Sequence, residues 1–132
     1  RWHSVTGVQT CALPIYAAAL DRKISRVALI EPYSSYRSFV MNRFYNTGFV
    51  HNLVAGALTE YDLPDLAATL APRKLLMSGT SDCNGDKTDK DNIKADLAVI
   101  RNSYKTGNAE NHLIIREETS DDHMNILREW MK

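Results

Sequence analysis

The chain has few cysteines, no excess of either charge and no long apolar run, and each shortage excludes a class of protein. Its two cysteines, Cys11 and Cys83, form neither a CxxC motif nor a zinc spacing, so we expect two free thiols. Sixteen basic residues balance sixteen acidic ones, which gives no electrostatic reason to expect nucleic acid or an anionic membrane as a partner. The apolar runs are far too short to cross a bilayer. We therefore expect one globular domain, or part of one.

The first fifteen residues follow no structural period. They show neither helical nor strand periodicity and contain no continuous apolar stretch of the kind a signal peptide needs. Pro14 is expected to interrupt a helix running into the following segment. Residues 4–15 resemble a translated sequencing adaptor. We therefore interpret residues 1–15 as a non-native leader and place the domain at residues 16–132; an ordinary irregular N-terminal segment is the alternative.

Three short apolar segments beyond the leader predict strands. They lie in Ile24–Glu31, in Lys74–Ser78 and in Leu113–Ile115. Each is apolar without alternation, which is typical of strands covered on both faces of a parallel sheet.

Helical patterns separate these strands. Tyr16–Asp21 has the composition of a helix end. Asp62 is placed as the N-cap of a helix that carries Pro64 and Asp65 in its first turn and stops at Pro72. Further along the chain, Thr88 is a candidate N-cap and Gly107 a candidate C′ residue. The apolar stripes of the last two predicted helices are Ile93, Leu97, Ile100 and Tyr104, and then Met124, Leu127 and Met131, with Arg128 and Lys132 off the second stripe.

Strands that alternate with helices predict an α/β fold with about three parallel strands and flanking helices. Residues 33–60 do not fit that alternation. They are rich in aromatic residues, contain Gly48 and Gly56, and are interpreted as a cap-like insertion of short helices and loop. Packing of Phe39, Phe44 and Tyr45 on the sheet is an equal alternative.

Two residues are candidates for catalysis, because each follows a predicted strand. Asp82 comes four residues after Lys74–Ser78, and His123 lies in the loop after Leu113–Ile115. Ligands of an open parallel sheet bind beyond the carboxyl ends of its strands, and a carboxylate that orients an imidazole needs this placement. Considered one at a time, each residue has a simpler structural explanation: Asp82 as a turn residue and His123 as the start of a helix.

The other candidates are weaker. Asp86, Asp89 and Asp91 compete with Asp82, but the closing Glu of a calcium loop is missing. His112 is expected to cap or pack a strand, His51 to lie on the surface, and His3 belongs to the leader. No metal site and no cofactor is predicted.

The segment Tyr61-Asp62-Leu63-Pro64-Asp65-Leu66-Ala67-Ala68-Thr69-Leu70-Ala71-Pro72-Arg73-Lys74-Leu75-Leu76-Met77 resembles the region before the catalytic acid in α/β-hydrolases of the acetyl xylan esterase and prolyl-oligopeptidase-like group. Ser34–Ser38 and Tyr16–Asp21 are also similar to that group. The resemblance implies the C-terminal part of an α/β-hydrolase fold, with Asp82 as acid and His123 as base of a Ser-Asp-His triad.

The nucleophile of that triad is not found, since no Gly-x-Ser-x-Gly motif occurs in the chain. Glu31, directly after the first predicted strand, is a rival acid. The resemblance implies a serine esterase that acts on small esters or acylated polysaccharides, with neither nucleic acid nor membrane as a partner, and the chain by itself is expected to be inactive. A peptidase on the same scaffold and a non-catalytic α/β interaction module are the alternatives.

Overall fold

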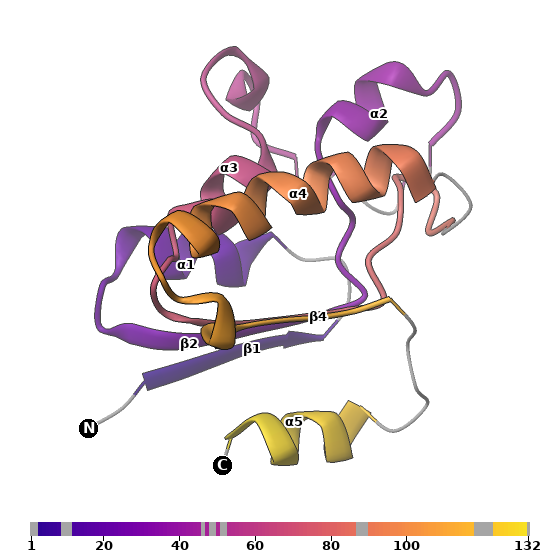
Figure 1. The fold of residues 1–132 in the computed structure, drawn as a ribbon. Helices are drawn as coiled ribbons and strands as arrows, with labels where there is room; N and C mark the ends of the chain where they lie inside the picture. The colour runs from indigo at the N-terminus through magenta and orange to yellow at the C-terminus, as the bar shows by residue number, and fades with distance from the viewer. Residues whose placement is uncertain are drawn as a thin grey trace.

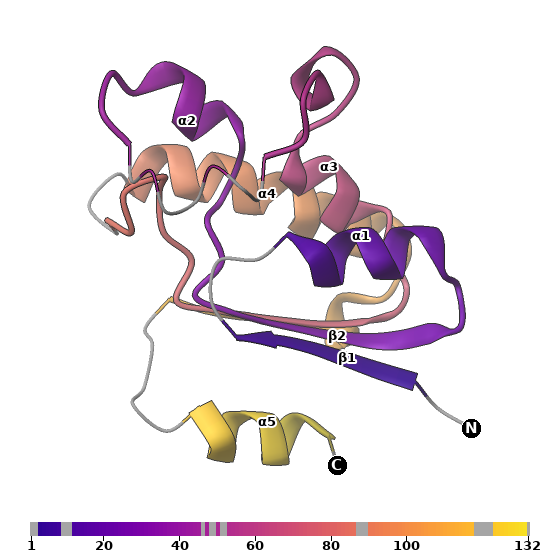
Figure 2. The same cartoon turned by 180° about the vertical axis from the view of Figure 1, so that it is seen from behind.

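Four parallel strands form one sheet in the order β1-β2-β3-β4. The structure is a computed structural model that describes residues 3–8, 12–45, 47, 50, 53–86, 90–117 and 123–131, without the side chains of residues 3–8, 123 and 124. The strands are β1 (His3–Val8), β2 (Ile24–Ile30), β3 (Lys74–Ser78) and β4 (Leu113–Arg116). Helices α1 (Leu13–Leu20), α3 (Leu63–Ala68) and α4 (Lys90–Thr106) cover one face, and α5 (His123–Met131) lies on the other (Figures 1 and 2). The predicted α/β class with parallel strands and flanking helices is confirmed.

The three predicted strands are present within a residue of their expected ends. Val27, Leu29, Leu75 and Met77 contribute to the core under α1, α3 and α4, while Ala28, Ile30 and Leu76 contribute to a second core under α5. Successive side chains of a strand point to opposite faces. Apolar residues without alternation therefore serve two cores at once, as the sequence pattern indicated.

The fourth strand, β1, comes from the segment interpreted as a leader. It pairs with β2 from His3 opposite Ile24 to Val8 opposite Ile30. Helix α1 also begins inside that segment, at Leu13. Pro14 stands in its first turn, where a backbone N–H would have no partner within the helix, so the proline is tolerated. The expectation that Pro14 interrupts the helix was therefore wrong. The non-native origin of residues 1–15 stays a prediction.

Helix α3 begins as its sequence predicts. Asp62 is the N-cap, Asp65 completes a capping box, and a proline occupies the first turn. One other group ties the turn after this helix to its surroundings. The guanidinium group of Arg73, which directly precedes β3, donates to the carbonyl oxygens of Ala18 at 2.6 Å and Ile24 at 3.0 Å, and thus joins this turn to α1 and to the start of β2.

Helix α4 buries its predicted stripe but ends differently from its predicted end. Ile93, Leu97, Ile100 and Tyr104 are all buried. The predicted N-cap, Thr88, lies outside the described residues. At the other end Asn108, and not Gly107, has the left-handed backbone, with φ of 51°. The Asn108 N–H bonds to the Lys105 carbonyl and the Ala109 N–H to the Tyr104 carbonyl, which is a Schellman motif with Asn108 at C′.

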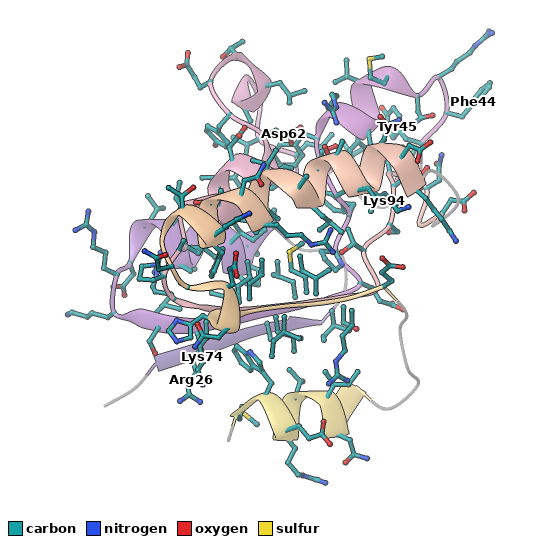
Figure 3. The ribbon with its side chains drawn as sticks, in the orientation of Figure 1. Arg26, Phe44, Tyr45, Asp62, Lys74 and Lys94 are labelled. Carbon is teal, nitrogen blue, oxygen red and sulfur yellow. The ribbon has the colours of Figure 1, made fainter. Side chains whose placement is uncertain are left out.

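Helix α5 packs on the sheet through a face that includes Leu127 of the predicted stripe but not Met131. Ile126, Leu127 and Trp130 are buried against β2 and β3, whereas Met131 is 50% exposed. Arg128 lies off the buried face, as predicted. Arg26 on β2 donates to the Met131 carbonyl oxygen at 2.7 Å and holds the end of α5 to the sheet; Figure 3 shows Arg26 on the α5 side. The side chain of Met124 and residue 132 lie outside the described part.

The segment after β2 contains a short helix, α2 (Arg37–Met41), and a 3-10 turn, η2 (Ala57–Thr59). Some of its aromatic residues pack into the core and others are exposed, so neither the cap-like insertion nor the packing alternative holds for all of them. Phe39 is buried and contacts the ring of Tyr33 edge-on, so it packs as core. Phe44 is 77% exposed and points away from the molecule in Figure 3. The segment is therefore anchored by Phe39 and again by Ala57, which is buried in the same core, while Phe44 between them is exposed.

Candidate functional site

The four strands end in one row, which brings their outgoing connections to one edge of the sheet. Val8 pairs with Ile30, Ile30 with Ser78, and Ser78 with Arg116. The candidate acid Asp82 lies four residues past this row, and the candidate base His123 seven residues past it. The carboxyl edge is where parallel sheets place ligands. The structure thus confirms that both segments leave the same edge.

Asp82 is positioned by the two chain segments that leave β2 and β3 together. The Ser81 N–H bonds to the Pro32 carbonyl at 3.0 Å, and the Ser34 N–H bonds to the Ser81 carbonyl at 2.8 Å. These bonds continue the pairing of the two strands past their ends. They hold Asp82 beside the serine-rich segment that follows β2.

The Asp82 carboxylate organises its own loop. Its Oδ1 atom accepts hydrogen bonds from the backbone N–H groups of Asn84 and Asp86, each at 2.8 Å. These two bonds give Asp82 the role of a turn residue, which was the alternative to catalysis in the sequence analysis. Asp82 also lines a cavity of about 420 Å³ together with Ser34, Ser35 and Ser38.

An ion pair crosses the same cavity. A guanidinium nitrogen of Arg37 lies 2.6 Å from the Oδ1 atom of Asp96, whose side chain is only 8% exposed. A buried carboxylate needs such a partner, because desolvation would otherwise disfavour its charge. Sequence reasoning missed this pair. The available signal was an acidic residue on the buried face of α4, between Ile93 and Ile100.

Cys83, next to Asp82, is a buried free thiol. Burial, and then the nearby Asp82 carboxylate, raise the pKa of the Cys83 thiol. The Asn42 side-chain amide donates a hydrogen bond to its sulfur at 3.3 Å. The prediction of a free thiol is confirmed at Cys83. A buried thiol with a raised pKa is a poor nucleophile. Cys11 lies outside the described residues.

His123 is the first residue of α5, and its side chain lies outside the described part of the chain. The Asp82 loop leaves the sheet edge on the side of α4, whereas α5 lies across the opposite face (Figure 1). A hydrogen bond between Asp82 and His123 therefore remains a prediction.

The rival acid, Glu31, has an unusual backbone. It follows β2 directly, its N–H bonds to the Ser78 carbonyl at 2.7 Å, and its φ is 53°. A left-handed conformation costs a residue with a Cβ atom roughly 1–2 kcal/mol. Such residues cluster at functional sites. Glu31 therefore remains a candidate.

Of the remaining histidines, only the side chain of His112 lies in the described part of the chain. The His112 ring nitrogen Nδ1 lies 2.6 Å from the Pro72 carbonyl oxygen, which is the packing role predicted for it. His51 and the side chain of His3 lie outside the described residues. Within the part of the chain that the structure describes, no three His, Cys, Asp or Glu side chains gather as a metal site would require.

Among the described helices, none combines the length and the apolar character needed to span a membrane. A scan of the sequence against protein-family models matched none. Searches of the curated proteins and of the solved structures also returned no match.

Proposed function

We propose that this chain is the C-terminal part of a serine carboxylic-ester hydrolase similar to acetyl xylan esterases, and that it contributes the acid and the base of a Ser-Asp-His triad. The observation that carries the proposal is the common row in which the strands end. The connection that contains Asp82 follows β3 and the chain that leads to His123 follows β4, so both depart from one edge of a parallel sheet, which supports the proposal. The order of the two residues along the chain is that of α/β-hydrolases.

In this proposal a serine attacks the carbonyl carbon of the ester. His123 takes the serine proton and returns it to the departing alcohol oxygen, and Asp82 holds the imidazole in the correct tautomer. Water then attacks the acyl-serine with the same base, which releases the acid and restores the serine. The substrate is a small ester or an acylated polysaccharide.

The serine of this proposal is missing from the chain, and the succession of β1 and α1 supports a position for it between them. A strand, a short connection and a helix are the context in which a Gly-x-Ser-x-Gly elbow stands, and residues 9–12 connect β1 to α1. The chain has Gly7 at the first position of that pattern and Gln9 where the serine belongs. We therefore expect the chain itself to hydrolyse p-nitrophenyl acetate no faster than a histidine-containing control protein.

The test restores the elbow with Gln9→Ser and Cys11→Gly. The double variant should react with a fluorophosphonate at position 9, whereas the starting chain should not. Adding His123→Ala should abolish the labelling, since the proposal assigns the serine proton to this histidine, and Asp82→Asn should slow it by several orders of magnitude. His112→Ala is the matched control and should leave the labelling unchanged.

Two results would defeat the assignment. Labelling that survives His123→Ala would show that this histidine is not the base. If Glu31→Gln cripples labelling while Asp82→Asn is mild, the acid belongs to the earlier strand.

A non-catalytic α/β module is the second candidate. It is favoured by the two backbone hydrogen bonds that the Asp82 carboxylate accepts from its own loop, because these give Asp82 a structural role without any histidine. Absence of labelling in the restored elbow, with the fold intact by circular dichroism, would support it.

A further inference from the structure

A second cavity, of about 230 Å³, lies between the first turns of α4 and the carboxyl ends of β3 and β4. Its apolar wall is formed by Ile93 and Leu97, whose side chains belong to the core. Lys90 and Lys94 line it from the exposed side of α4. The cavity is thus apolar on one side and cationic on the other, and it contains neither Asp82 nor any residue assigned to the triad.

The described residues that line the cavity carry a net positive charge, since Lys90, Lys94 and Arg116 stand against one acidic residue. Lys90 and Lys94 are four residues apart and therefore share one face of the helix. No described carboxylate lies within ion-pair distance of either lysine; the ion pairs join Arg37 to Asp96 and Arg116 to Glu129. Glu117 is the one acidic residue among those that line the cavity. Figure 3 shows Lys94 on the half of α4 that lies above the end of β4.

The hydroxyl group of Thr80 independently indicates that the cavity can hold a hydrogen-bond acceptor. It lines the cavity one residue beyond the Gly79 that follows β3, it is 6% exposed, and its Oγ1 atom is buried without a hydrogen-bond partner. Buried hydroxyl groups nearly always have a partner. Rotation about the Cα–Cβ bond exchanges the methyl and hydroxyl groups of threonine, so the hydroxyl can turn to the cavity when an acceptor enters.

We propose that this cavity binds a short-chain carboxylate, with the anionic head at Lys94, Lys90 and the Thr80 hydroxyl and the apolar tail against Ile93 and Leu97. A charged acceptor would satisfy the hydroxyl and the ammonium groups together. The apolar wall distinguishes such a ligand from an inorganic anion, whose binding would gain nothing from Ile93 and Leu97. The inference does not depend on ester hydrolysis.

The experiment is an amide-resolved NMR titration of the full chain with sodium butyrate. Saturable shifts are expected at Thr80, Lys94 and Glu117. Acetate, which has two fewer methylene groups, should bind on the order of tenfold more weakly. 1-Butanol, which lacks the charge, should not saturate the same amides.

Three variants separate a binding role from a structural one. Thr80→Val removes the hydroxyl at constant shape; it should weaken butyrate binding about threefold to tenfold while leaving the thermal midpoint unchanged or higher, since the hydroxyl has no partner to lose. Lys94→Gln should weaken binding, and Glu117→Gln should strengthen it. Lys105→Gln, at the far end of α4, is the matched control and should have no effect.

The proposal fails if butyrate produces no saturable shifts, or if acetate binds as well as butyrate, which would indicate a surface anion site only. It also fails if 1-butanol competes equally, because the charged groups would then be irrelevant. A Thr80→Val variant that loses stability would show that the hydroxyl has a partner within the protein.

Discussion

Among the described residues other than glycine, two have a left-handed backbone conformation, which residues with a Cβ atom normally avoid. Glu31 and Asn108 have φ of 53° and 51°. At Asn108 the conformation has a local explanation, because it closes the Schellman motif at the end of α4 and asparagine tolerates it better than most residues. At Glu31 no comparable local advantage exists, and its position at the sheet edge keeps it in question as an acid.

Asn108 allows a test of which residue terminates α4. Asn108→Ala should destabilise the protein by about 1 kcal/mol, because the Cβ atom of alanine clashes with the backbone in the left-handed conformation. Asn108→Gly should be neutral or stabilising, because glycine has no Cβ atom. Gly107→Ala should be mild, since its Cβ would meet the Ser103 carbonyl oxygen at 3.4 Å in ordinary contact. Urea denaturation measures all three. A larger cost at Gly107 than at Asn108 would restore Gly107 as the C′ residue.

At the scale of elements, one carboxylate connects the beginnings of two helices. Asp62 caps α3 through the Leu63 N–H at 2.6 Å, and the same side chain accepts the N–H groups of Tyr36 at 2.6 Å and Arg37 at 3.1 Å, where α2 begins. The segment after β2 is thereby fixed to α3. Since Arg37 also pairs with Asp96, this contact orders one wall of the cavity that Asp82 lines.

We expect Asp62→Ala to cost about 2–3 kcal/mol, because it removes the cap of one helix and charge-assisted bonds to the next. Asp65→Ala is the matched control: it breaks only the reciprocal half of the capping box and should cost about 1 kcal/mol. Chemical denaturation gives both values. Equal costs for the two variants would mean that the contact with α2 contributes nothing.

At the scale of the whole molecule, β1 forms one edge of the sheet and places β2 in its interior. β1 pairs with β2 from Ile24 to Ile30, so β2 is not an edge strand. The strand therefore protects β2 whatever the origin of its sequence. An unpaired, apolar central strand would invite aggregation.

Deleting residues 1–11 should uncover the backbone of β2 and produce concentration-dependent oligomers, measured by size-exclusion chromatography with light scattering. Deleting residues 1–2 alone leaves β1 intact and serves as the control. A soluble monomer with a sharp cooperative melt after the longer deletion would show that β1 is dispensable, as expected for a leader that is foreign to the fold.

The types of the elements after residue 16 were readable from local pattern. Uninterrupted apolar runs predicted β2, β3 and β4, and the cap at Asp62 and the stripe from Ile93 to Tyr104 predicted α3 and α4, because these signals arise from hydrogen bonding and periodicity within a few residues. The placement of Asp82 and His123 after consecutive strands followed from the same patterns.

Other features depend on contacts between segments far apart in sequence. Residues 3–8 form a strand because β2 offers an edge, and Ile126 and Trp130 face inward because the sheet presents Ile30 and Leu76 to them. The Arg37–Asp96 pair joins side chains 59 residues apart. A local pattern states which conformations a segment prefers, but the surface it meets is made by the rest of the chain, and burial against that surface outweighs preferences of a few tenths of a kcal/mol per residue.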